Sequence, residues 1–416
     1  MGSGKSSAAI NYMNSHPDRK FVYITPYLEE AERIRRSCPK LRFKEPNNKL
    51  PEYGFKKYTH TVELLTSGEN ITSTHSMFLR YSDDMIDIIK KHGYTLIVDE
   101  AVDVLRQADI GAQDVGLLDS AGWLTKKDFY IDVKPQFDYK EGVFSEVVSL
   151  AKGNRLIDMR DYGGVEAYYF WVFSKDILEA FSDVIVLTYL FESQTMKYYM
   201  DIHNMTYTKI GVRVDENGLY QFGEYMEYIP EYTATLSSKI HIFENKKLNA
   251  VGDSKHALSH SWFAKCTAAQ HEKKELLRRN MNNFFINYHR DKPVKRRLWS
   301  TYNLGKKILR SKGYFYNDIA FNAKATNDYK DRDVLAYCVN VFMQPCEKNF
   351  LIKNGVEVRE DEHALSVMIQ WIWRSAIREG NEMWIYIPSK RMRDLLKDWI
   401  QSVENTYAQT KEIQTA

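Results

Sequence analysis

The 416-residue sequence has no apolar run approaching the eighteen or so residues that a membrane span requires. It also lacks a hydrophobic stretch of the signal-peptide kind near its start. Internal repeats and low-complexity tracts are missing as well. These absences predict a folded globular protein of the cytoplasm that works without a membrane partner.

Cysteine is scarce. The four cysteines stand far apart, without CxxC or mixed His/Cys spacing, at positions Cys38, Cys266, Cys338 and Cys346. Neither a disulfide framework nor a zinc site is indicated by this pattern. We expect four reduced thiols, as is usual inside cells.

Charge of one sign is not in large excess, since the formal net charge is only +3. Its distribution is more informative, because binding surfaces for nucleic acid depend on where charge lies. The stretch 273–312 holds thirteen Lys/Arg against two acidic residues, whereas 103–146 holds nine acidic residues against five basic ones. The basic stretch favours a nucleic-acid surface, with a solvated helical face as the alternative.

What the sequence does contain is a series of short apolar runs rich in β-branched and aromatic residues. Buried strands are predicted at 21–25, 94–98 and 184–188, and later at 239–243, 297–301, 318–321 and 383–387. Helical spacing alternates with them at 28–34, 77–88, 273–288, 363–378 and 390–400. Such alternation predicts an α/β fold in which helices cover both faces of parallel sheets.

The domain organisation is predicted from the places where the alternation of strand and helix patterns is interrupted. Residues 1–205 are expected to form a first domain, interrupted at about 106–168 by an insertion without clear periodicity. Residues 206–400 are expected to form a second α/β domain, and 401–416 a polar tail.

The start of the chain, Met1-Gly2-Ser3-Gly4-Lys5-Ser6-Ser7, has the form of the end of a phosphate-binding P-loop. In such a loop the backbone amides and a helix amino terminus hold phosphate, the lysine reaches the terminal oxygens, and the first serine binds Mg²⁺. The full GxxxxGK[ST] pattern would place its first glycine before residue 1, and the strand that usually feeds the loop is missing too. A Gly/Ser-rich start without functional meaning is the alternative.

A second motif lies about a hundred residues later. The apolar run 96–98 ends in two adjacent carboxylates, Asp99 and Glu100. Neighbouring side chains of a strand point in different directions, so Asp99 can hold a hard cation while Glu100 activates water. The interval from Lys5 fits the two halves of a P-loop NTPase site.

Together these motifs resemble the DEAD/DEAH-type helicases of superfamily 2, in particular the phage and viral replication branch related to origin-binding proteins. Ile24-Thr25-Pro26 resembles motif Ia, the run Thr72 to Phe78 resembles motif Ib, and Leu187-Thr188-Tyr189 stands where motif III would be. The resemblance implies that Thr25, Pro26, Thr74 and His75 contact the nucleic-acid backbone. The alternative is that Thr25-Pro26 only ends a strand and His75 only starts a helix.

Near the carboxyl end, Gln370, Arg374 and Arg378 recur at spacing i, i+4 and i+8, which predicts one polar stripe on a helix. The segment resembles motif VI, although Trp373 replaces a glycine and the second arginine stands one residue late. The resemblance implies catalytic roles, with Arg374 as the arginine finger; surface arginines are the alternative. The run 321–328 resembles motif V and offers Thr326 and Asn327 as nucleic-acid contacts, against a plain Asn-Asp turn.

The resemblance implies two tandem RecA-like P-loop NTPase domains that bind ATP and Mg²⁺, with catalytic Glu100, and act on single-stranded or forked DNA rather than RNA. A replication protein is an expected partner, in the host cytoplasm if a phage encodes the chain. Two alternatives stay open. One is a P-loop motor that remodels or packages nucleic acid without unwinding, and the other is a catalytically impaired scaffold.

Overall fold

The computed structural model describes residues 4–49, 51–54, 56–137, 139, 142–163, 169–225, 234–323 and 328–415. The chain forms two compact units. The first comprises Gly4–Met226 and Met343–Val358, and the second comprises Glu227–Phe342 and Arg359–Ala416. The first unit therefore extends beyond residue 205, where the sequence placed its end, and it includes a segment from the second half of the chain.

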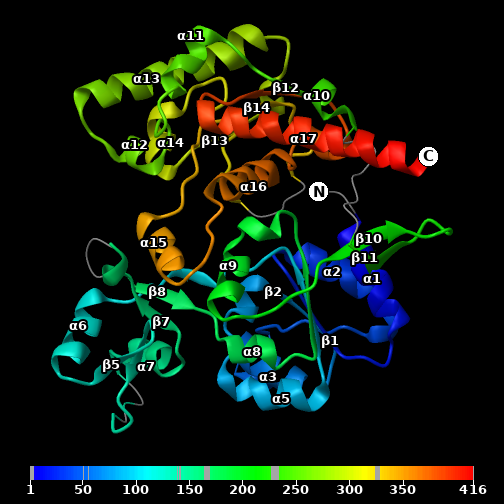
Figure 1. Cartoon of the computed structure of the whole chain (residues 1–416), viewed down its shortest axis with the longest axis vertical. Helices are drawn as coiled ribbons and strands as arrows, with labels where there is room; N and C mark the ends of the chain where they lie inside the picture. Colours follow the sequence, from blue (N-terminus) through cyan, green and yellow to red (C-terminus); the bar gives the residue numbers. More distant parts are fainter. Residues whose placement is uncertain are drawn as a thin grey trace. The chain divides into compact units, whose positions relative to one another are not determined.

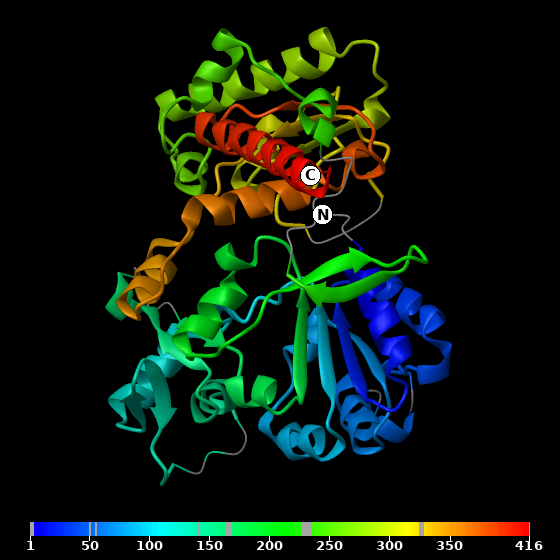
Figure 2. The same ribbon diagram turned by 45° about the vertical axis from the view of Figure 1, so that its right-hand side comes forward.

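A parallel four-stranded sheet organises the first unit (Figures 1 and 2). Its strands, in spatial order, are β2 (Ile71–Thr74), β1 (Phe21–Thr25), β3 (Thr95–Asp99) and β9 (Asp183–Leu187). The three strands predicted for this region are confirmed to within one residue. The inner strand β1 is buried along its whole length, whereas Asp183 and Val184 are exposed at the edge strand β9.

Side chains alternate between the two faces of this sheet, as the pleat requires. Val22 and Leu96 belong to one buried cluster, while Phe21 and Ile97 belong to another that includes Ala9 of helix α1. Helices cover the sheet as the sequence predicts. They are α1 (Lys5–Ser15), α2 (Leu28–Ser37), α3 (Lys57–Thr66), α4 (His75–Phe78), α5 (Ile86–His92), α8 (Lys175–Glu179) and α9 (Thr195–Ile202). The helix predicted at 77–88 is instead split between α4 and α5.

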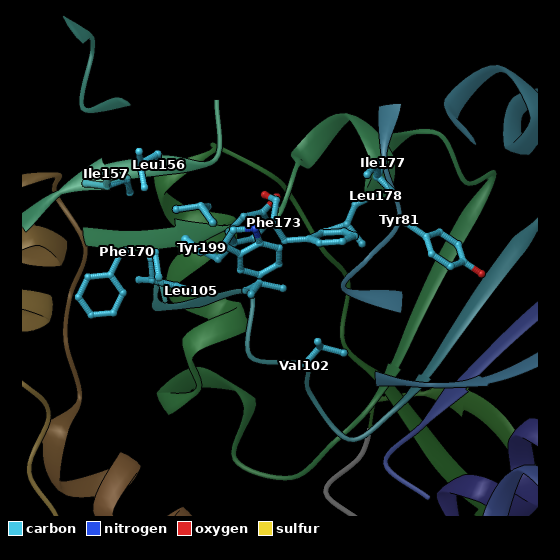
Figure 3. Packing of buried hydrophobic residues seen from close by; sticks show 14 of the residues in the cluster. Tyr81, Val102, Leu105, Leu156, Ile157, Phe170, Phe173, Ile177, Leu178 and Tyr199 are labelled. Carbon is cyan, nitrogen blue, oxygen red and sulfur yellow. The ribbon is translucent and has the colours of Figure 1, made fainter. Parts of the chain in front are cut away.

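The insertion folds as a five-stranded antiparallel sheet in the order β4-β8-β7-β6-β5. Its elements are β4 (Leu105–Gln107), α6 (Ala112–Ser120), β5 (Leu124–Lys127), β6 (Tyr130–Val133), α7 (Ser145–Lys152), β7 (Leu156–Asp158) and β8 (Tyr169–Val172). Its buried residues join the larger core of the first unit (Figure 3), where the Tyr199 hydroxyl donates to the Phe173 carbonyl at 3.0 Å. The expected insertion is thus an ordered subdomain.

Helix α15 (Pro345–Lys353) packs on this insertion, although in the chain it lies between β14 (Val334–Tyr337) and β15 (Met383–Tyr386), two strands of the second sheet. Phe350 is fully buried, with ring centroids 5.3 Å from Phe129 and 5.0 Å from Tyr162. The Asn349 amide donates to the Tyr162 carbonyl at 3.0 Å, and the Lys353 ammonium donates to the Asp161 carbonyl at 2.8 Å. Apolar contacts and backbone bonds therefore hold this helix in the first unit.

A second parallel sheet organises the second unit. Its order is β12 (Ile240–Ile242), β15 (Met383–Tyr386), β14 (Val334–Tyr337) and β13 (Arg297–Ser300). The helices are α10 (Leu236–Lys239), α11 (Lys246–Asn249), α12 (His260–Ala264), α13 (Ala268–Asn283), α14 (Asn303–Leu309), α16 (Glu360–Ile372) and α17 (Lys390–Thr415). The α/β fold class with two parallel sheets and an insertion in the first unit is confirmed.

Several local predictions for the second unit were wrong. Strand β14 was missed, and the strand predicted at 318–321 is only an isolated bridge between Trp299 and Asp318. The helix expected at 363–378 ends at Ile372, where Trp371 and Ile372 are already buried. The tail expected from residue 401 continues α17, because a single helix runs to Thr415.

A β-hairpin follows α9 and belongs to the first unit. Strands β10 (Ile210–Val214) and β11 (Tyr220–Glu224) pair in antiparallel fashion. The hairpin packs on α1, where the Asn11 amide donates to the Tyr220 carbonyl at 2.8 Å and the Tyr12 and Phe222 rings lie 5.7 Å apart. None of the helices among the described residues is long and apolar enough to cross a bilayer.

Candidate active site

The phosphate-loop segment begins helix α1 in the first unit. Gly4 has φ +74° and caps the amino terminus of the helix, which Lys5 starts. Residues with a side chain rarely adopt this left-handed conformation, so glycine is required here. A Cβ at Gly4 would also lie 2.1 Å from the Tyr220 ring. Ser7 follows in the first turn, whereas Gly2 and Ser3 lie outside the described residues.

The two motifs separated in sequence meet at the carboxyl end of β3. The Ser6 hydroxyl donates to Asp99 Oδ1 at 3.4 Å. Lys5 lies near enough to Asp99 and Glu100 that both carboxylates act on its pKa. Carboxyl ends of parallel strands and helix amino termini meet at one edge of an α/β sheet, which is where such proteins bind ligands.

The environment of these charged groups is largely desolvated. Burial, followed by the charges of Glu30 and Glu100, raises the pKa of Asp99 to about 7. Burial lowers the pKa of Lys5, and the two carboxylates of the site oppose that effect. Low solvent exposure strengthens every electrostatic interaction with a bound ion or phosphate. The site is therefore suited to a ligand that supplies compensating charge.

Glu100 has a strained backbone. Its φ of +62° lies in the left-handed region, although it carries a side chain, and its amide donates to the Leu187 carbonyl of β9 at 3.0 Å. Such strain costs about 1–3 kcal/mol and is concentrated at functional sites. This strained residue directly follows Asp99, the last residue of β3.

Two buried hydroxyls lie on the same face of β1, that of Thr25, which the sequence had singled out, and that of Tyr23, which it had not. Tyr23 and Thr25 are both fully buried, and neither hydroxyl completes a hydrogen bond with any described residue. The Ser6 side chain is nevertheless close enough to lower the pKa of Tyr23 against the much larger upward effect of burial. A tyrosine inside an otherwise apolar strand was the available signal in the sequence, since buried polar groups normally have partners.

An ion pair on α2 also reaches this site. Arg33 Nε donates to Glu30 Oε2 at 2.8 Å, and both charges act on the pKa of Asp99, Glu30 raising it and Arg33 lowering it. Helix α2 begins directly after the segment resembling motif Ia. Glu30 and Arg33, whose charges act on Asp99, thus belong to the helix that follows the segment resembling motif Ia.

The residues expected at the nucleic-acid side lie at the carboxyl ends of β1 and β2. Thr25 is paired in register with Thr74, which caps α4 by accepting from the Met77 amide at 3.4 Å. Pro26 and Thr74 are half-buried, whereas Thr25 is fully buried. His75 is buried too, and its Nε2 lies 2.9 Å from the Asp99 carbonyl. This placement suits His75 to holding the end of β3.

The segment resembling motif III forms a hydrogen-bonded turn after β9. The Thr188 hydroxyl donates to Gln194 Oε1 at 2.9 Å, and the Gln194 amide donates to the Tyr189 carbonyl at 2.7 Å. Leu190 between them has φ +54°, a second strained position near this edge of the sheet. Gln194 had not been singled out in the sequence.

The stripe expected from Gln370, Arg374 and Arg378 does not form, because α16 ends at Ile372. Gln370 is half-buried in the last turn, Arg374 is 3% exposed in the following turn, and Arg378 is exposed in a short 3₁₀ helix. The prediction of one outward-facing helical stripe was therefore wrong. All three residues lie in the second unit. The other expected contacts there, Thr326 and Asn327, lie outside the described residues.

The donor set fits a cation that is held only partly by protein. Within the described ranges, no group of three or more His, Cys, Asp or Glu side chains forms a metal cage. Mg²⁺ in phosphate sites usually takes one or two protein oxygens and fills its shell with phosphate and water. The Ser6 hydroxyl and the Asp99 carboxylate match that requirement.

Fold and site together define a two-unit α/β protein whose first unit gathers a Lys-Ser pair and an Asp-Glu pair at the carboxyl end of a parallel sheet. Residues 234–400 match the family model described as the YonV C-terminal Rossmann-like domain. Over 414 residues the chain is 36% identical to the SPbeta prophage-derived uncharacterized protein YonV of Bacillus subtilis (strain 168), and the alignment covers 97% of each protein. The chain belongs to the YonV family.

Several solved structures are similar to this chain at low sequence identity. One titled XPD_Helicase has a TM-score of 0.48 at 11% identity and covers 95% of this chain and 93% of that chain. S. tokodaii Xpd4 has a TM-score of 0.45 at 10% identity, with coverage of 96% and 92%. The DUF1998 helicase MrfA bound to DNA and AMPPNP has a TM-score of 0.31 at 9% identity and covers 94% of this chain and 45% of that chain.

Proposed function

We propose that this protein is an ATP-dependent motor of the helicase or translocase kind. The observation that carries the proposal is the contact of Ser6 with Asp99 beside Lys5 and Glu100. A lysine and a serine at a helix amino terminus, facing an aspartate and a glutamate at a strand end, form the donor set for a nucleoside triphosphate with its metal.

Each residue of the loop has a role in this proposal. Gly4 permits close approach of phosphate to the backbone, and the amides of Ser6 and Ser7 bind phosphate at the start of α1. Gly2 and Ser3, which precede Gly4 in the sequence motif, are proposed as further phosphate-binding residues. Lys5 neutralises the terminal phosphates, since a half-buried ammonium is a strong partner for an anion where water is partly excluded.

Ser6 and Asp99 would hold Mg²⁺, and the ion when bound would neutralise charge on the phosphate oxygens. Glu100 is proposed to orient the attacking water, since it directly follows Asp99 and its carboxylate is near enough to act on the pKa of Lys5. The expected products are ADP and phosphate. Release of strain and charge at this site would drive the conformational cycle of a motor.

For the track we propose single-stranded or forked DNA. Thr25, Pro26 and Thr74 lie at the strand ends next to the nucleotide site, where phosphate contacts could be coupled to hydrolysis. Thr326 and Asn327 are proposed as contacts from the second unit. The prophage origin in the name of the similar Bacillus subtilis protein supports a role in phage DNA replication or recombination, with a replication protein as a further partner.

Arg374 is proposed as the residue that completes the catalytic charge balance, assisted by Arg378 and Gln370. An arginine that stabilises transition-state charge typically raises the rate of hydrolysis by about 10³–10⁵-fold. Arg374→Ala should lower ATP turnover while leaving nucleotide affinity nearly unchanged. A loss of affinity and of thermal stability together would instead assign Arg374 to the packing of the second unit.

The experiment that tests the proposal is ATPase activity with and without single-stranded DNA, compared between the wild-type chain and Lys5→Ala. Stimulated hydrolysis that Lys5→Ala abolishes supports a motor. Strand separation on a forked duplex then distinguishes unwinding from translocation or remodelling. Mg²⁺-dependent nucleotide binding without hydrolysis would favour a catalytically impaired scaffold and overturn the motor assignment.

A further inference from the structure

Three consecutive aromatic residues in the second unit, 314–316, differ in their exposure to solvent. In the turn after α14, Tyr314 is fully buried, whereas Phe315 is 38% exposed and Tyr316 is 90% exposed. The rings of Phe315 and Tyr316 contact each other edge to face, with centroids 4.6 Å apart. Two adjacent aromatic side chains therefore leave the core and present ring surface to water.

The turn that carries them is anchored on both sides. The Tyr314 hydroxyl donates to the Leu309 carbonyl at 2.8 Å, and Trp299 Nε1 donates to the Tyr314 carbonyl at 2.9 Å. On the other side the Asn317 amide donates to the Val294 carbonyl at 2.6 Å. Because these hydrogen bonds already fix the backbone of the turn, binding of a ligand to the rings costs little conformational entropy of the protein.

The surroundings of the two rings are cationic. Between residues 306 and 318 the chain carries four Lys/Arg and one acidic residue. That acidic residue, Asp318, is shared by Lys306 at 3.1 Å and Arg310 at 3.3 Å. The Arg310 guanidinium also lies 5.1 Å from the centre of the Phe315 ring, and Lys312 is exposed. The rings are thus bordered by net positive charge.

We propose that Phe315 and Tyr316 form a stacking platform for the bases of single-stranded nucleic acid, with Arg310 and Lys312 at its phosphate backbone. Exposed rings beside cations match both parts of a nucleotide strand, whereas a duplex keeps its bases inside. An apolar protein partner would favour an apolar border in place of the lysines. This inference rests on the proposed function for its ligand class, but it assigns a location that the proposed function does not require.

The test measures the binding of a fluorescently labelled oligothymidylate to the full chain by anisotropy at several salt concentrations. Tyr316→Ala should weaken binding by about 5- to 100-fold, the range for loss of one stacked base. Its salt dependence should stay that of the wild type, because no charge is removed. Lys312→Ala should instead reduce the slope of log affinity against log salt by about 1.

Matched variants separate stacking from other roles. Tyr316→Trp should retain wild-type affinity, because tryptophan also stacks on bases. Tyr316→Leu should behave like Tyr316→Ala, because leucine is apolar but has no aromatic ring on which a base can stack. Tyr225→Ala serves as a control, since Tyr225 is 52% exposed in the first unit and has Lys209 5.8 Å from its ring centre. It should bind like the wild type.

Two results would overturn the inference and are distinguishable from each other. If the wild type binds the oligonucleotide and Tyr316→Ala binds equally well, the platform is wrong while the proposed function stands. If the wild type binds no single strand under any salt condition, the proposed function fails with it. Within the first result, a change of oligomeric state in Tyr316→Ala would assign the rings to contacts between copies of the chain.

Discussion

The Ser6 hydroxyl donates a hydrogen bond to Asp99 Oδ1 at 3.4 Å across a separation of 93 residues in the chain. This contact joins the start of α1 to the end of β3, and it is short enough for one cation to reach both oxygens after a small shift. Lys5, Glu100 and the buried Tyr23 hydroxyl surround it.

Lys5→Ala should abolish most Mg²⁺-nucleotide binding. Loss of a charge-assisted phosphate contact is worth about 1.5–3 kcal/mol, which corresponds to a decrease in affinity on the order of 10- to 100-fold. Because burial lowers the pKa of Lys5, the substitution should not reduce the free energy of unfolding. Titration with a fluorescent ATP analogue measures the first effect and urea unfolding the second. Lys90→Ala, an exposed position on α5, is the control and should change neither.

Tyr23→Phe and Tyr81→Phe should have the same effect on the free energy of unfolding but different effects on Mg²⁺-dependent nucleotide binding. Both hydroxyls are fully buried and complete no hydrogen bond among the described residues, so removing either should raise the free energy of unfolding by about 1 kcal/mol. Tyr81 lies in the opposite core (Figure 3). Only Tyr23→Phe should also reduce, by about 5-fold, the gain in nucleotide affinity on adding Mg²⁺. An equal Mg²⁺ effect in both variants would leave Tyr23 a purely structural residue.

Gly4→Ala and Gly116→Ala should shift stability in opposite directions. Gly4 has φ +74°, and a Cβ there would meet the Tyr220 ring. Strain of this kind costs about 1–3 kcal/mol, and we expect nucleotide binding to be lost with it. Gly116 lies within α6 with open space around it, so alanine should stabilise the helix by about 0.5–1 kcal/mol. Thermal unfolding of the two variants makes the comparison.

Phe350→Ala should release α15 from the insertion. The ring is fully buried against Phe129 and Tyr162, and truncation of a buried phenylalanine costs about 3–5 kcal/mol. Hydrogen exchange should therefore increase in both α15 and the insertion strands. Ile352→Ala on the same helix is the control, because Ile352 is 53% exposed and should have little effect. Exchange confined to α15 would show that the insertion folds without it.

Acid should destabilise the first unit through His203. Burial, followed by the charge of Lys175, lowers the pKa of His203 to about 4, and its Nε2 lies 3.2 Å from the Tyr130 hydroxyl. The folded state thus binds a proton less readily than the unfolded state, whose histidine titrates near pH 6.5. The neutral His203 therefore leaves the free energy of unfolding at its full value above about pH 6.5. That free energy falls by on the order of 1–2 kcal/mol as the pH decreases toward 4, a figure reduced because His203 is partly accessible to water.

Urea unfolding of the wild type and His203→Gln between pH 4 and 7 measures this effect. The variant should lose less stability over that range, because glutamine does not titrate. If both proteins lose the same amount, other groups account for the acid sensitivity.

The local patterns in the sequence predicted three of the four strands of the first sheet, β1, β3 and β9, and the meeting of the two nucleotide motifs, whereas β2 was not predicted. Strand β1 was predicted at its observed bounds because five consecutive apolar or β-branched residues suit a strand buried on both faces. Strand β14 was missed because four residues make too short a pattern, and its stability comes from pairing with β13 and β15. The false strand near Asp318 has the right composition but only one bridge to a neighbour.

The sequence by itself determined the α/β class, the position of the insertion and the placement of Ser6 and Asp99 at one sheet edge, because hydrophobic period and motif order are local properties. Only the tertiary structure decided the rest. The burial of Tyr23 behind Ser6, the return of α15 to the first unit, and the end of α16 before Arg374 depend on contacts between segments far apart in the chain. Such contacts are set by packing and desolvation, which no local pattern of residues encodes.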